Sequence, residues 1–177
     1  AGLHGRVGHL TAQNVRWGVR NVDGEQVIYV SGEVVETRLG GQSLKLVREV
    51  LFETSAPSIT VQDAVYNIGY GPAEHMFRHH FNIGFPVFDD GDTLVVQGGV
   101  VEDRDSDTRV SGPLVVTLDT ATVPEPERVW SCWPQDAVPG QARSGEAQIV
   151  TASGAVKMKL EWSGTGFDRL LAWRDAS

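Results

Sequence analysis

Apolar and polar residues alternate with a period of two along most of this 177-residue chain. Such alternation is typical of β-strands with one buried face. Twenty Gly and eight Pro residues separate the alternating segments and predict turns between them. The predicted strands are Gln26–Gly32, Glu33–Thr37, Ser43–Thr54, Ser58–Asn67, His75–Ile83, Asp92–Val96, Leu114–Leu118, Arg128–Cys132, Glu146–Thr151, Lys157–Trp162 and Arg169–Trp173. Many short strands without an amphipathic helix predict an all-β fold, an antiparallel β-sandwich formed by residues 1–177 as a single domain.

The predicted strand His75–Ile83 carries two chemically different faces, because alternate side chains of an extended chain point in opposite directions. The residues on its apolar face are Phe77, His79, Phe81 and Ile83, and those on its polar face are Arg78, His80 and Asn82. A cation, an imidazole and an amide on one side suit proton transfer and hydrogen bonding to a polar ligand. The alternative for His80 is a buried, hydrogen-bonded structural histidine, and both interpretations stay open.

Two charged residues fall on predicted apolar faces. Arg48 shares a face with Leu46 and Val50, and Asp63 lies among aliphatic residues of the following strand. A turn at residues 54–57 would place the two charges opposite each other. A buried charge requires a partner, so we expect either a structural ion pair or a pair that faces a substrate.

Composition narrows the classes of partner and location. The formal net charge is −8, and no cluster of Lys and Arg stands out, which argues against nucleic acid and anionic membranes as partners. The single cysteine, Cys132, excludes an intrachain disulfide and favours a cytoplasmic location. No apolar run approaches the roughly 20 residues that span a bilayer. Val101–Gly112 is predicted to be a soft region, in which the acidic run at residues 102–107 forms a solvated loop.

Neither metal binding nor a nucleotide loop is predicted. His75 and His79 have the spacing of a helical metal motif, but four residues of a strand span about 13 Å, which is too far for ligands of one ion. Four tryptophans are expected in the sandwich core, although one or two could form a platform for a sugar ring. These are Trp130, Trp133, Trp162 and Trp173.

Several motifs, taken together in their order, resemble the aldose 1-epimerase (galactose mutarotase) family. Residues 3–8, Leu-His-Gly-Arg-Val-Gly, followed by Trp17, resemble the family's His-Gly element, and residues 80–84 resemble its His-x-Tyr-Phe-Asn-Leu-x-Gly element. The uncharacterised aldose-epimerase-like branch is the more similar one. Its shared features are the Asp-x-Val-x-Asn strand at residues 63–67, the His80, Asn82, Gly84, Pro86 pattern and the Leu-x-x-Trp-Arg segment at residues 170–174.

This resemblance implies a large antiparallel sandwich, or supersandwich, with a sugar site on a concave face. It also implies interconversion of sugar anomers by acid–base ring opening, with a small-molecule sugar as partner and no cofactor. His80 would be the general acid. The residues expected to bind substrate are His4, Arg6, Arg48, Asp63, Arg78, Asn82 and Glu127.

The sequence departs from the family in two ways. Arg78 holds the position that the classical motif gives to its histidine, and His80 lies two residues later. The family's general base, a Glu after the Trp-Lys/Arg element, is absent because the chain stops at Ser177. We therefore expect a fragment of a longer epimerase; the alternatives are a carbohydrate-binding sandwich without the base and a purely structural sandwich. A fragment with open strand edges could also form a homodimer.

Overall fold

The computed structural model describes residues 5–119, 127–134, 143–164 and 167–174. Every strand pair in this part of the chain is antiparallel. The chain divides into two compact units, residues 1–76 and 77–177. The antiparallel all-β prediction is thus confirmed, while the assignment of residues 1–177 to one domain stays a prediction.

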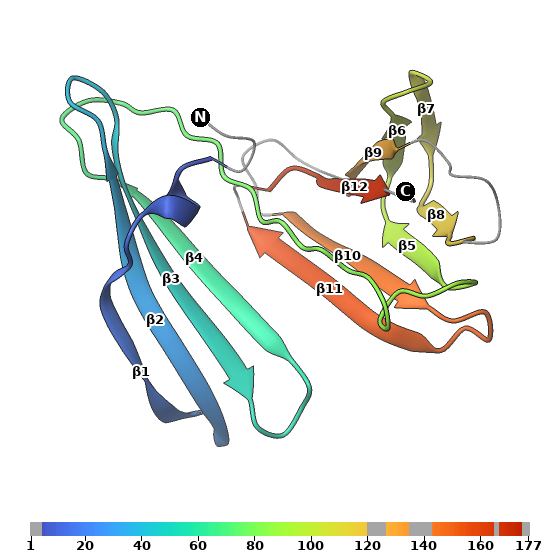
Figure 1. The fold of residues 1–177 in the computed structure, drawn as a ribbon, viewed down its shortest axis with the longest axis horizontal. Helices are drawn as coiled ribbons and strands as arrows, with labels where there is room; N and C mark the ends of the chain where they lie inside the picture. Colours follow the sequence, from blue (N-terminus) through green and yellow to red (C-terminus); the bar gives the residue numbers. More distant parts are fainter. Residues whose placement is uncertain (1–4, 120–126, 135–142, 165–166, 175–177) are drawn as a thin grey trace. The chain divides into compact units, whose positions relative to one another are not determined.

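The first unit contains one four-stranded sheet, sheet A, with the strand order β1-β2-β3-β4 (Figure 1). Its elements are the short 3-10 helix η1 (Val7–His9), β1 (Gln13–Val22), β2 (Glu25–Thr37), β3 (Ser43–Glu53) and β4 (Ile59–Asn67). The turn between β1 and β2 contains Asp23 and Gly24, both with positive φ angles of 51° and 90°. Two residues of this kind form the turn whose twist matches that of the flanking strands.

Sheet A departs from the predicted strands at two places. The two strands predicted over residues 26–37 form the single strand β2, because Gly32 continues the ladder and pairs with Arg48. Strand β1 was not predicted, although Val15, Trp17 and Val19 alternate with polar residues and glycine. The interspersed arginines and glycine hid this alternation.

The second unit contains two four-stranded sheets. Sheet B has the order β11-β10-β5-β8, and sheet C the order β12-β9-β6-β7. The strands are β5 (Thr93–Gln97), β6 (Val100–Asp103), β7 (Thr108–Ser111), β8 (Leu114–Thr117), β9 (Arg128–Trp133), β10 (Arg143–Val150), β11 (Val156–Gly164) and β12 (Leu170–Arg174).

The two sheets of the second unit share one hydrophobic core, which makes this unit a β-sandwich. The buried residues from both sheets are Val96, Val101, Leu114, Trp130, Cys132, Ala147 and Ala172. Trp162 packs against this core. Cys132 is buried, as expected, whereas Trp173 is 51% exposed and the prediction of a core position for it was wrong.

The soft region predicted over residues 101–112 is wrong for most of its length, whereas the solvated loop predicted at residues 102–107 is confirmed as a turn at residues 104–107. Strands β6 and β7 form a hairpin there, and only residues 104–107 form the turn. Val101 and Asp103 face the core while Glu102 lies on the outer face, so the acidic residues hid a short alternating strand. The charges of the turn itself are exposed, as expected.

The predicted strand at residues 75–83 does not form. Between Asn67 and Thr93 the structure has no helix or strand, so this segment joins no ladder. The alternation of its faces survives in part: Phe77 and His79 are partly buried and Arg78, His80 and Asn82 are exposed, but Phe81 of the apolar face is 50% exposed. The described part of the chain contains no helix long and apolar enough to cross a membrane.

Candidate functional site

His80, Asn82 and Trp173 come together in the second unit. The Nε2 atom of His80 lies 2.8 Å from Oδ1 of Asn82, and an amide oxygen only accepts, so Nε2 donates this hydrogen bond. The imidazole stands edge-on to the indole of Trp173, with ring centroids 6.5 Å apart and planes at 90°. An oriented imidazole beside a half-exposed indole combines a proton-transfer group with an apolar ring surface.

The exposed segment around His80 borders an open cavity of about 490 Å³. The residues that line it are His80, Phe81, Asn82, Ile83, Gly84, Phe85, Val87 and Met158. Met158 comes from β11, so the cavity lies between this strand and the segment that carries His80. A cavity of this size accommodates a monosaccharide.

The opposite face of the segment is held by contacts between aromatic rings rather than by a strand ladder. His79 lies 5.3 Å from Phe77, 6.0 Å from Phe81 and 5.3 Å from Phe167, measured between ring centroids. The predicted backing face therefore exists, with Phe167 as a partner that sequence reasoning missed. No local pattern marks Phe167, which lies about ninety positions further along the chain.

Lys157 of β11 holds the C-terminal end of the segment that carries His80, through contacts with Pro86 and Asp92. Its Nζ atom lies 2.5 Å from Oδ2 of Asp92 and 3.5 Å from the carbonyl oxygen of Pro86. The backbone N–H of Asp89 donates to the same carboxylate at 2.9 Å. These two hydrogen bonds, that from Lys157 above all, hold the pKa of Asp92 below its ordinary value, against the opposing effect of burial.

In the first unit, Arg48 and Asp63 form the expected pair. They are opposite in the β3–β4 register, and two hydrogen bonds of 2.8 Å join the guanidinium to both carboxylate oxygens. The hydrogen bond to Asp63 raises the pKa of Arg48, and partial burial opposes this shift. The pairing is confirmed, while a role in binding substrate stays a prediction.

The other predicted site residues are dispersed. Arg6 pairs with Glu36 at the surface of the first unit. Glu127 lies 3.4 Å from the guanidinium of Arg104 beside sheet C, and Arg78 is exposed on the segment that carries His80. His4 lies outside the described residues. The structure thus brings His80 and Asn82 together and adds Trp173. The sequence signals for Trp173 were the Leu-x-x-Trp-Arg resemblance and the alternative that one or two tryptophans form a platform for a sugar ring.

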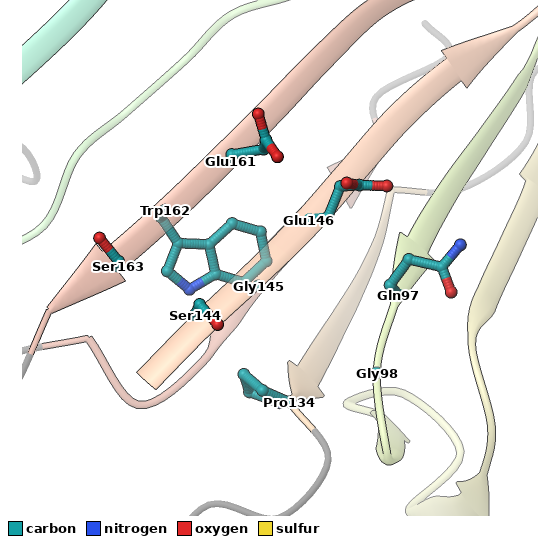
Figure 2. A pocket seen from close by; sticks show the side chains of 9 residues that line it. All are labelled: Gln97, Gly98, Pro134, Ser144, Gly145, Glu146, Glu161, Trp162 and Ser163. Atoms are coloured by element: carbon teal, nitrogen blue, oxygen red, sulfur yellow. The ribbon is translucent and has the colours of Figure 1, made fainter. Parts of the chain in front are cut away.

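A second open cavity, of about 590 Å³, was not predicted from the sequence (Figure 2). Its lining residues are Gln97, Gly98, Pro134, Ser144, Gly145, Glu146, Glu161, Trp162 and Ser163. Gln97, Glu146 and Glu161 are register partners across β5, β10 and β11. The Trp162 indole lies against Gly145, where an added Cβ would meet its Cζ2 atom at 2.1 Å. Glycine is therefore required at position 145 for this indole position.

The described residues contain no group of three His, Cys, Asp or Glu side chains arranged to hold a metal ion. The candidate site consists of an imidazole, an amide, an indole and the cavity beside them.

Comparison with known proteins gives one family and one fold. A family model described as a domain of unknown function, DUF4432, matches residues 1–177. No curated protein matches the chain. A crystal structure of a proposed aldose 1-epimerase from Klebsiella pneumoniae subsp. pneumoniae MGH 78578 is similar, with a TM-score of 0.75 and 18% sequence identity. The match covers 98% of this chain and 44% of that chain, so the chain spans less than half of its neighbour's length. The chain has the β-sandwich fold of this neighbour.

Proposed function

Because the chain belongs to the DUF4432 family and shares the fold of a proposed aldose 1-epimerase, we propose that it carries the acid side of a sugar-anomer-interconverting site. The observation that carries the proposal is the hydrogen bond of 2.8 Å between His80 and Asn82 beside the exposed indole of Trp173. In this role His80 is the general acid, Asn82 orients its ring, and Trp173 supports the apolar face of a sugar.

The proposed reaction requires two proton transfers, one from the anomeric hydroxyl to a base and one from His80 to the ring oxygen. In this reaction the His80 ring donates a proton to the sugar while the hydrogen bond between Nε2 and Asn82 fixes its orientation. A base removes the proton of the anomeric hydroxyl, the bond from the anomeric carbon to the ring oxygen breaks, and the ring oxygen takes the proton from His80. Rotation about the adjacent carbon–carbon bond and reclosure give the other anomer. An imidazole suits this role because it donates and accepts near neutral pH.

The remaining substrate-binding assignments belong to the same proposal. Asn82 and Arg78 are on the segment that carries His80, and Glu127 lies two positions before Val129, which pairs with Trp173. His4, Arg6, Arg48 and Asp63 would bind the sugar in the whole protein, which would also supply the base. A cytoplasmic location and a homodimer are further predictions; light scattering checks the dimer.

Polarimetry of freshly dissolved α-D-glucose and α-D-galactose tests the activity. We expect a mutarotation rate above the buffer rate for the whole protein, which includes the base, and the buffer rate for its His80→Ala variant. His9→Ala is the matched control, since His9 is an exposed histidine of η1, and it should keep full activity. An unchanged rate in His80→Ala would contradict the assignment of the acid.

The half-exposed indole of Trp173 favours a second function, carbohydrate binding without turnover. In that case sugar would change the tryptophan fluorescence of the protein while mutarotation stayed at the buffer rate. Trp173→Ala should abolish the change of fluorescence on addition of sugar, whether the protein catalyses mutarotation or only binds the sugar. Circular dichroism of each variant checks that the sandwich is intact.

A further inference from the structure

The cavity beside His80 is lined mostly by apolar side chains. Those among its described lining residues, which we call the apolar wall, are Phe81, Ile83, Phe85, Val87 and Met158. The lining side chains that carry hydrogen-bonding nitrogen or oxygen atoms are His80 and Asn82, and these two are joined at 2.8 Å. A ligand in the cavity would therefore meet one imidazole and one amide among side chains that otherwise offer only carbon and sulfur.

Contacts within the second unit hold the apolar wall in place. The backbone N–H groups of Val87 and Phe88 both donate to the carbonyl oxygen of Gly84, at 2.9 and 3.0 Å, and close a turn. The ring of Phe81 stacks on that of His79, with ring centroids 6.0 Å apart. The two backbone bonds also occupy both lone pairs of a carbonyl oxygen that could otherwise accept from a ligand hydroxyl.

The apolar wall is accessible to a ligand. Phe85 is 81% exposed, Phe81 is 50% exposed and Val87 is 38% exposed. A methyl group placed against these side chains would remove apolar surface from water, which is favourable. A hydroxyl in the same place would give up hydrogen bonds to water and find no acceptor on the wall side chains. The wall therefore favours an apolar group of the ligand over a hydroxyl.

The ring oxygen of a pyranose has two carbon neighbours, the anomeric carbon and C5, which carries C6. If His80 donates to the ring oxygen and the base faces the anomeric hydroxyl, C5 and C6 lie beside His80 on the other side of the ring oxygen. We propose that the apolar wall receives C6 and that the site takes 6-deoxyhexoses, in which C6 is a methyl group instead of a hydroxymethyl group. The identity of the ligand as a sugar rests on the proposed function.

The test compares two pairs of sugars that differ by one oxygen atom at C6. These are 6-deoxy-D-galactose with D-galactose, and 6-deoxy-D-glucose with D-glucose. Calorimetry measures the dissociation constant of each sugar from the whole protein. In the pair that binds more tightly, we expect the deoxy sugar to have an affinity about five- to ten-fold higher than its partner.

Two substitutions in the apolar wall test its part in this preference. Met158→Gln places an amide of similar size in the wall and should remove the preference, because the amide can bond to a hydroxyl at C6. Val87→Thr adds one hydroxyl without a change of shape and should reduce the preference. Met76→Gln is the matched control, since Met76 is 91% exposed and does not line the cavity, and it should keep the full preference.

Equal affinities within both pairs would overturn the proposal, as would tighter binding of the hydroxymethyl sugars, absence of binding, or a preference that persists unchanged in both wall variants. Mutarotation of the whole protein decides the proposed function separately. A preference for the deoxy sugar that depends on Met158, without mutarotation, would support the role of the wall and refute only the enzyme. Mutarotation that His80→Ala abolishes, with no preference within either pair, would refute only the role of the wall.

Discussion

Arg48 and Asp63 lie directly opposite each other on β3 and β4 and are joined by two hydrogen bonds of 2.8 Å. The arginine side chain is 44% exposed, whereas the aspartate side chain is 7% exposed. The two partners therefore differ in what their removal leaves behind. Loss of the arginine would remove two charge-assisted hydrogen bonds from a buried carboxylate, and loss of the aspartate would leave a cation that can reach water.

Arg48→Met should lower the free energy of unfolding by about 1–3 kcal/mol. This is less than for a fully buried pair, because solvent screens the exposed guanidinium. Urea unfolding of the full chain measures the change. The double variant Arg48→Met/Asp63→Leu is the control and should recover part of the stability, since it leaves no unpaired charge. A double variant less stable than Arg48→Met would contradict this account.

The contact between Lys157 and Asp92 predicts sensitivity to acid. The folded-state pKa of Asp92 is below its ordinary value, so the carboxylate stabilises the fold above its unfolded-state pKa. This stability is lost as the pH falls through the folded-state value. We expect Lys157→Met to lower the urea midpoint at pH 7 and to have a smaller effect below about pH 4.

Lys159→Met is the matched control for this prediction. Lys159 lies on the same strand, but its side chain is 45% exposed and pairs with the surface carboxylates of Glu146 and Glu161. It should have little effect at either pH. Equal losses for Lys157→Met at pH 7 and in acid would show that the carboxylate of Asp92 is not the group involved.

Gly145→Ala should destabilise the second unit by about 1–3 kcal/mol. The added Cβ would lie 2.1 Å from Cζ2 of Trp162, so the indole must leave its position against the core. Thermal unfolding and the near-ultraviolet circular dichroism of tryptophan report the two effects. Gly71→Ala is the control, because a Cβ there meets no atom within 4 Å. An unchanged tryptophan signal in Gly145→Ala would refute the prediction.

Cys132 should be inert to thiol reagents in the folded protein. Its side chain is 1% exposed, and desolvation raises the pKa of its thiol to about 12. Almost no thiolate, the reactive form, is then present at pH 8. We expect modification by a disulfide reagent only in urea, at a rate that follows unfolding. Rapid stoichiometric labelling of the native chain would be inconsistent with this burial.

The sequence predicts features of this fold that depend on local alternation and turn chemistry. The strands around Arg48 and Asp63 follow from their apolar faces, and their pairing follows from a short turn between them. Where charged or small residues interrupt the alternation, as in β1 and β6, the prediction fails. These two strands form because tertiary packing buries one of their faces. Such burial cannot be predicted from a short stretch of sequence.

Part of the candidate site could likewise be predicted from the sequence, and part could not. His80 and Asn82 are two residues apart, so their shared face could be predicted from an extended backbone. Trp173 and Phe167 contact the same segment from about ninety residues away, and only the folded chain brings them there.

The segment from Phe77 to Ile83 lacks a strand ladder, and its position depends on ring contacts. Its amides should therefore exchange hydrogen for deuterium faster than those of the neighbouring strands. Natural variation should be greater at positions outside these ring contacts than at the aromatic residues that form them. Replacements at Arg78 leave the ring contacts intact, whereas a small residue at Phe77 or Phe167 would move the imidazole of His80 without touching it. The aromatic residues would then restrict which substitutions this family can accept without displacing the imidazole of His80.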